Sequence, residues 1–135
     1  MNAEFYAKKL TQIFPEYEQV YAEHIEDFGE LLGHVFFGSV FNSQLSKLLL
    51  ANSNKEEIQK YIDFIEDMYA NGDTGIQDIV GVTILAYLGD DDTILKHAFS
   101  YFSEDIIQVS KILESGYGRR EIKIHYGNGK VYADW

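Results

Sequence analysis

Apolar residues recur at intervals of three and four along most of the chain, a spacing typical of amphipathic helices. Residues 3–14 carry one such stripe, and Pro15 should end this helix, because the residue before a proline is pushed out of the α region. Since proline also suits the first turn of a helix, we expect a second helix at residues 16–28. Its apolar face would be formed by Tyr17, Val20, Tyr21, His24 and Phe28.

Residues 31–41 are strongly apolar, but glycines interrupt them. A glycine inside a helix costs about 1 kcal/mol relative to alanine. We therefore expect turns or a broken helix here, buried under the other helices, and then a short helix at residues 42–51. The glycines are Gly29, Gly33 and Gly38. The phenylalanines of this stretch are interpreted as core, with an interface anchor ringed by acidic side chains as the alternative. They are Phe36, Phe37 and Phe41.

Helix start and stop signals follow in the second half of the chain. Asn54 begins a capping-box pattern, and Gly72 is placed to end that helix. Thr74 and Gln77 form a second capping-box signal before residues 75–88. Because these residues are apolar nearly all round, we expect their helix to be central and covered on several sides.

Two more helices and a hairpin complete the pattern. The acidic run 90–92 begins one helix, and Ser103 caps the other. Residues 121–135 alternate between apolar and polar on both sides of a glycine-containing turn, which predicts a β-hairpin. Its apolar face should pack on the helices, since an isolated two-stranded hairpin is marginally stable. The expected fold class is all-α, a bundle of six to seven helices with this small C-terminal β-hairpin, in one domain spanning residues 1–135.

The charge of the chain is strongly negative. Its 135 residues include 22 acidic and 11 basic ones, which gives a formal net charge of −11. By segment, the charge is −7 over residues 1–70, −6 over residues 71–116 and +2 over residues 117–135. Nucleic acid and anionic membranes bind proteins through Lys and Arg, so neither is expected as a partner. Acidic surfaces keep proteins soluble, and this one also suits a basic protein partner.

No segment indicates export or membrane insertion. The N-terminus lacks the basic and apolar regions of a signal peptide. No uncharged stretch is long and apolar enough to span a bilayer. The absence of cysteine excludes disulfides and thiol catalysis and suits a reducing cytosol. We therefore expect a cytoplasmic protein.

No motif of the chain is equipped for catalysis. The serines lack the Gly-x-Ser-x-Gly pattern, and the glycines near residue 128 lack the spacing of a phosphate-binding loop. We therefore expect no enzymatic activity and no cofactor. His24 and His34 lie among acidic residues, but their spacing fits no standard metal pattern, so no metal site is predicted. Two alternatives stay open. One is a small metal-dependent hydrolase that uses these histidines with nearby carboxylates, and the other is a housekeeping scaffold or regulatory domain.

Two acidic clusters are the candidate partner-binding residues, which would pair with Lys and Arg of a partner. The first cluster belongs to the end of the second predicted helix and consists of Glu23, Glu26, Asp27 and Glu30. The second cluster consists of Asp90, Asp91 and Asp92, which a capping role at a helix start also explains. Tight binding would further need desolvated anchors, often aromatic, at the centre of the interface.

Several runs of residues resemble a small acidic helical bacterial family. They are Phe14-Pro15-Glu16, Glu23-His24, Phe28-Gly29-Glu30-Leu31-Leu32, His34-Val35-Phe36-Phe37-Gly38 and Ile84-Leu85-Ala86-Tyr87-Leu88-Gly89-Asp90-Asp91. The resemblance covers residues 4–115. That family is catalogued mainly as a domain of unknown function, and its members are suspected immunity proteins, which neutralise toxins delivered between competing bacteria. The resemblance implies a protein that binds a cognate toxin, with no cofactor and no catalytic residues. Family members often carry a proline before the histidine, where this chain has Gly33.

Overall fold

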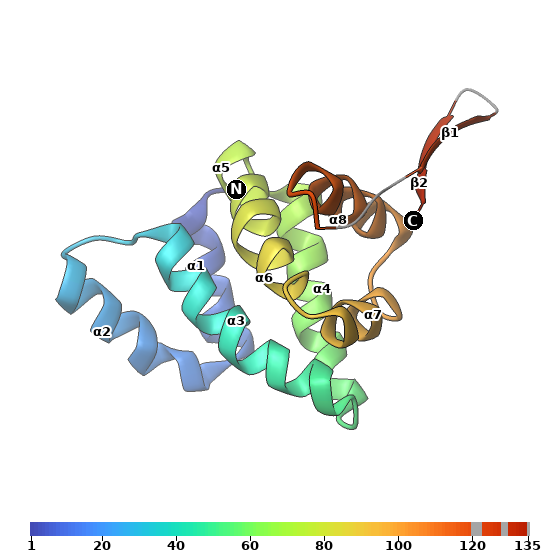
Figure 1. Cartoon of the computed structure of the whole chain (residues 1–135). Helices are drawn as coiled ribbons and strands as arrows, with labels where there is room; N and C mark the ends of the chain where they lie inside the picture. Colours follow the sequence, from blue (N-terminus) through green and yellow to red (C-terminus); the bar gives the residue numbers. More distant parts are fainter. Residues whose placement is uncertain (120–122, 128–129, 135) are drawn as a thin grey trace.

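The computed structural model describes residues 1–119, together with the backbone of residues 123–127 and 130–134 (Figure 1). Counting α5, η2 and α6 as one continuous helix, seven helices occupy the described residues, which confirms the expected helical bundle. Within that part of the chain, no helix has the length and apolar character that crossing a membrane requires. The elements are α1 (Ala3–Ile13), the short 3-10 helix η1 (Pro15–Tyr17), α2 (Glu18–Phe28), α3 (Gly33–Ala51), α4 (Lys55–Asn71), α5 (Thr74–Asp78), the π-helical segment η2 (Ile79–Leu85), α6 (Ala86–Leu88), α7 (Asp92–Phe99) and α8 (Glu104–Gly116).

The helices begin largely where the sequence places their caps. The Asn54 side chain accepts a hydrogen bond from the backbone N–H of the third residue after it, and Ser103 does the same before α8. The expected cap at Thr74 is wrong by one residue. Asp73 is the cap, because its carboxylate accepts from the Ile76 N–H at 2.9 Å, which makes Thr74 the first residue of the helix.

The prediction of a broken helix at residues 31–41 is wrong, because α3 runs without interruption from Gly33 to Ala51. Its glycines allow close packing. A Cβ atom at Gly33 would lie 2.8 Å from Ile79 Cδ1, and one at Gly38 would lie 3.1 Å from Thr83 Cγ2. The glycines therefore let α3 approach η2 closely, and this tertiary packing outweighs their low helix propensity.

Aromatic side chains fill much of the core. The three phenylalanines of α3 are fully buried, so their interpretation as core is confirmed and the interface-anchor alternative is wrong for them. The Phe14 ring stacks on Tyr61, with ring centroids 4.5 Å apart, and ties the end of α1 to α4. Such pairs add to the area that large rings bury.

The continuous helix of α5, η2 and α6 packs against α3, α4 and α8, so the expectation that it is covered on several sides is confirmed. Four of its residues in η2 are buried, but Val82 is 54% exposed. In Figure 1, α2 lies at one end of the bundle and α7 at the other, with α3 and α6 between them.

The C-terminal hairpin is described only in its backbone, and only in part. The structure gives the backbone of β1 (Lys123–Gly127) and β2 (Lys130–Asp134), which pair antiparallel with Gly127 opposite Lys130. Residues 120–122, 128–129 and 135 and the side chains of both strands lie outside that description. The expected packing of an apolar hairpin face on the helices therefore stays a prediction.

Candidate protein-binding surface

The end of α2 and the connection that follows it carry the first predicted acidic cluster, with Glu30 two residues beyond the end of the helix. All four of its carboxylates, Glu23, Glu26, Asp27 and Glu30, are exposed. Glu23 accepts a hydrogen bond at 3.0 Å from Gln19, one turn earlier on the helix. Residues 10–46 contain six acidic side chains and neither Lys nor Arg. The negative potential of α2 is therefore not neutralised by a nearby cation in the sequence.

Phe28, the last residue of α2, is 50% exposed and lies close to these carboxylates in the sequence. Its ring lies against the imidazole of His24, with ring centroids 4.8 Å apart. The sequence pattern placed Phe28 on the inward face, but it is the last residue of α2 and the chain turns away at Gly29. The result is an aromatic side chain that contacts the His24 ring on one side and exposes half of its surface.

His24 has a structural role at the connection between α2 and α3. Its side chain is buried, and its Nε2 atom accepts a hydrogen bond at 2.9 Å from the backbone N–H of Leu32. The ring also meets Phe36 of α3 edge to face, with ring centroids 5.5 Å apart. His24 thus accepts the hydrogen bond of the Leu32 N–H just before α3, and its ring packs against Phe28.

The second histidine is engaged elsewhere. His34 is exposed, and its Nδ1 atom lies 2.6 Å from the hydroxyl of Thr83 on η2. The two histidines therefore contact different elements. In the part of the chain that the structure describes, no three or more side chains of the metal-binding types gather into a group that could hold an ion.

The acidic run at residues 90–92 divides into different roles. The Asp91 side chain caps α7 by accepting from the Ile94 N–H at 3.0 Å, so the capping interpretation is confirmed for this residue. Asp90 forms an ion pair with Arg119. Asp92 is exposed in the first turn of α7, where the helix dipole favours a negative charge. The predicted partner-binding residues Asp90 and Asp91 thus already have structural roles within the chain.

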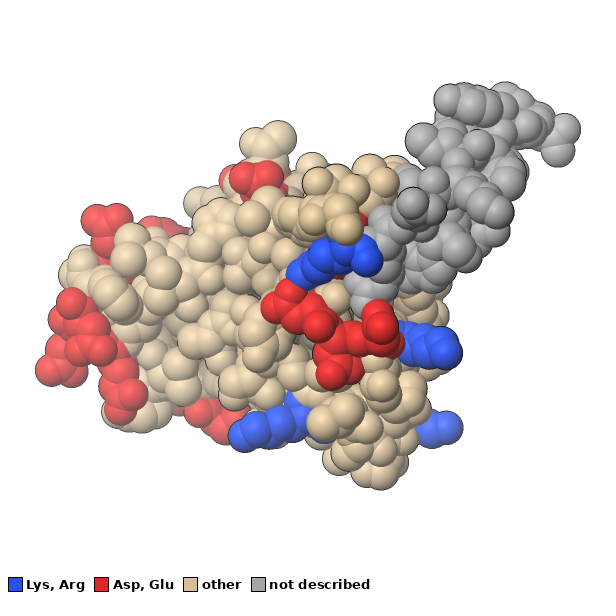
Figure 2. Space-filling view, viewed as in Figure 1, with Lys and Arg blue, Asp and Glu red and all other residues tan. Residues whose placement is uncertain are grey.

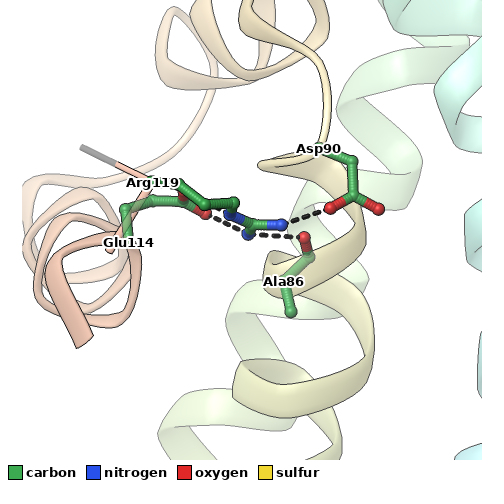
Figure 3. Close-up of polar contacts among 4 residues, drawn as sticks. All are labelled: Ala86, Asp90, Glu114 and Arg119. Atoms are coloured by element: carbon green, nitrogen blue, oxygen red, sulfur yellow. Dashed lines mark hydrogen bonds and ion pairs between the residues drawn. The ribbon is translucent and has the colours of Figure 1, made fainter. Parts of the chain in front are cut away.

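Arg119 is held by a buried carboxylate that the sequence argument missed (Figure 3). Glu114 is only 1% exposed, and its two oxygens accept from Arg119 Nε at 2.8 Å and from Arg119 Nη2 at 2.5 Å. Arg119 Nη2 also donates to the Ala86 carbonyl at 2.9 Å. The Glu114 hydrogen bonds raise the pKa of Arg119 above its ordinary value, despite partial desolvation. The sequence did hold one signal of this burial. Glu114 lies four residues after the buried Ser110, which places both on the same inward face of α8.

A shallow neutral groove lies between α3 and the continuous helix. Val82 and Tyr87 expose apolar surface there, and Asn42 and Thr83 supply polar groups. The Asn42 Oδ1 atom is buried and has no hydrogen-bond partner among the described residues. The groove borders the π-helical segment, and π-helical turns occur often at functional sites.

The two acidic clusters form separate groups. Figure 2 shows one group of carboxylates over α2 and another where α6 meets α7, with an uncharged surface between them over α3 and the continuous helix. The seven predicted residues thus do not form one continuous acidic surface. The first group lies near the end of α2, close in sequence to the half-exposed Phe28.

A family model with the description "Domain of unknown function (DUF7674)" matches residues 7–116. No match to the chain was found among curated proteins, and none was found among solved structures. The matched segment extends from α1 to the end of α8 and contains both acidic clusters and Glu114. Arg119 follows the matched segment.

Proposed function

The chain belongs to the family described as Domain of unknown function (DUF7674), and we propose that it is a non-enzymatic protein that binds a basic protein partner through the outer face of α2. The observation that carries this proposal is the group of four exposed carboxylates near the end of α2, close in sequence to the half-exposed Phe28. The carboxylates are Glu23, Glu26, Asp27 and Glu30.

Electrostatics support a basic partner. Exposed carboxylates without neighbouring cations produce a negative potential that accelerates association with a positive surface, most strongly at low salt. Individual exposed ion pairs contribute little affinity, typically 0.2–1 kcal/mol each. The four carboxylates therefore supply rate and selectivity more than binding strength.

The half-exposed Phe28 supports a specific interface, in addition to the attraction between charges. Interface energy concentrates in a few aromatic or arginine side chains that lose water when the partner docks. Phe28 exposes half of its surface and is held in place by the buried His24 ring. A side chain that is already ordered loses little conformational entropy on binding. Phe28 is thus suited to be the anchor, while the carboxylates attract the basic partner.

The basic partner can be specified further. We propose that it is a cognate antibacterial toxin, which the chain neutralises in the cytoplasm as an immunity protein. The resemblance of runs such as Phe28-Gly29-Glu30-Leu31-Leu32 motivates this identity, and the charge of the chain fits it. No catalysis is required, because covering the active surface of the toxin is sufficient.

Co-expression with the product of the adjacent gene tests the proposal. The expected result is a complex that co-elutes in size-exclusion chromatography, and survival of cells that otherwise die from the partner. A chain that forms no complex and gives no protection would overturn the toxin assignment. A complex without toxicity would leave the binding function and remove the immunity role.

A further inference from the structure

The cluster around Arg119 has the composition of a site for a guanidinium group. Four acceptor oxygens surround the Arg119 nitrogens, two from Glu114, one from Asp90 and one from the Ala86 carbonyl. Paired donors on a planar guanidinium match a carboxylate in a two-point contact, which a lysine ammonium cannot reproduce. Ala86 lies in the last turn of its helix, where unpaired carbonyls favour a cation.

The floor of this site is built by close packing. Gly89 lies so near Glu114 that even a methyl group there would collide with the carboxylate. Glu114 is therefore held at the turn between α6 and α7, and 99% of its surface is inaccessible to water. A buried carboxylate without a cation is costly, so the site requires a positive occupant.

The mouth of the site is open. The side chains of Asp90 and Arg119 are 60% and 30% exposed. Arg119 also borders two surface hollows, one lined by residues 89–93 and the other being the neutral groove that contains Tyr87 and Tyr117. The guanidinium carbon of Arg119 lies 5.0 Å from the centre of the Tyr117 ring, within cation–π range. An arginine that arrives from outside would meet the same acceptors from this side.

The occupant and the site come from different parts of the chain. Ala86, Gly89, Asp90 and Glu114 all lie within the family-matched residues 7–116, and Arg119 lies beyond them. The acceptors thus belong to the matched domain, whereas the arginine that fills them is supplied by the segment that follows α8.

We propose that this cluster is an arginine-recognition site in which Arg119 is an intramolecular occupant, replaced by an arginine of the bound partner. This inference rests on the proposed function in one respect, because the replacing arginine would come from the proposed partner. A tethered side chain competes at an effective concentration on the order of millimolar. A free arginine therefore cannot displace Arg119 easily, whereas a partner held by further contacts on α2 or in the groove can.

N-ethylguanidinium is the probe for the site, and the Arg119→Ala variant of the full chain is the receptor. The expected result is a saturable rise in the melting temperature of Arg119→Ala with increasing probe. Wild type should show no such rise, because Arg119 fills the site. Ethylammonium at the same concentration should raise the melting temperature much less, because it lacks the planar pair of donors. Arg119→Ala with Glu114→Gln should not respond, because the buried carboxylate is gone.

The outcomes separate the two proposals. If Arg119→Ala and the double variant respond equally to the probe, or neither responds, the recognition site is contradicted. If Arg119→Ala is unfolded alone, recovery of helical circular dichroism with N-ethylguanidinium, but not with ethylammonium, supports the site, and no recovery contradicts it. A probe response without any complex between the chain and the adjacent gene product would remove the proposed function and keep the site.

Discussion

Gly89 lies against the Glu114 carboxylate so closely that a Cβ atom at Gly89 would be 1.8 Å from Glu114 Oε1. The backbone of Gly89 has a φ of −72°, which any residue can adopt, so only the contact requires glycine. Gly89→Ala should therefore displace Glu114 from Arg119 and lower the free energy of unfolding by about 3 kcal/mol. Urea denaturation measures this loss.

Gly116→Ala is the matched control for that substitution. A Cβ atom at Gly116, the last residue of α8, would meet no atom within 4 Å. Alanine favours the helix by about 1 kcal/mol over glycine in helix interiors, so Gly116→Ala should leave stability unchanged or raise it slightly. Equal losses for both alanine variants would mean that the contact between Gly89 and Glu114 does not hold the turn.

His24→Phe should destabilise the connection between α2 and α3. Phenylalanine keeps the ring packing against Phe28 and Phe36 but offers no acceptor to the Leu32 N–H. A buried donor left without a partner costs about 1–3 kcal/mol. His34→Ala removes an exposed contact with Thr83 and should cost less than about 1 kcal/mol. Thermal or urea unfolding of both variants tests this order, and the reverse order would contradict the structural role of His24.

Asp67 should make the stability of the chain sensitive to acid. Burial favours a higher pKa, but hydrogen bonds from Lys9 at 2.5 Å and from Asn71 at 2.6 Å outweigh it and hold the Asp67 pKa below its ordinary value of 3.8. A pKa that is lower in the folded state stabilises the fold above the unfolded pKa, and this contribution is lost as the pH falls through the folded pKa.

The measurement compares the free energy of unfolding of wild type and Asp67→Asn across the acid range. The gap between them should be constant near neutral pH and shrink as the pH falls below about 4, since the unfolded carboxylate titrates there. Lys9→Met should weaken the same acid dependence, because it removes the cation that holds the pKa down. A gap that does not change with pH would show that Asp67 is not stabilised in its ionised form.

Local sequence rules predicted the helices well where one short motif determines a boundary. Asn54 and Ser103 cap their helices as expected, because a cap depends on residues three positions apart. The rules failed at Gly33 and Gly38, which suggested breaks in a continuous helix. Their role depends on contacts with Ile79 and Thr83, which lie more than 40 residues away in the sequence.

Local sequence patterns also predicted only part of the candidate site, because they do not show contacts between distant residues. The acidic residues of α2 were predicted from charge and helical spacing, and they are exposed as their spacing requires. The exposure of Phe28 was missed, because the apolar stripe does not show that the chain leaves the bundle at the end of α2. The cluster of Arg119, Glu114 and Asp90 was missed because it joins residues that are up to 29 positions apart.

Phe28→Ala should weaken partner binding far more than it weakens the fold. Half of the ring is exposed, so its removal should cost little more than about 1 kcal/mol of stability. Loss of an anchor typically costs 2 kcal/mol or more of binding, which corresponds to a drop in affinity of roughly thirtyfold or more. Phe5→Ala, another partly exposed phenylalanine, on α1, is the control and should keep its affinity. Calorimetric titration with the adjacent gene product distinguishes the two variants.

The affinity of charge-neutralised variants for the adjacent gene product tests whether the outer face of α2 binds a basic partner. The test variant carries Glu23→Gln, Glu26→Gln, Asp27→Asn and Glu30→Gln. The control carries Glu56→Gln, Asp63→Asn, Asp78→Asn and Asp105→Asn, which change four other exposed carboxylates and shift the net charge equally.

The α2 variant should lose roughly tenfold in affinity, as four lost ion pairs of about 0.35 kcal/mol each would give, and much of the salt dependence of association. The control should bind within a few-fold of wild type. Equal losses in both variants would show that only net charge matters, and an unaffected α2 variant would show that the partner binds elsewhere.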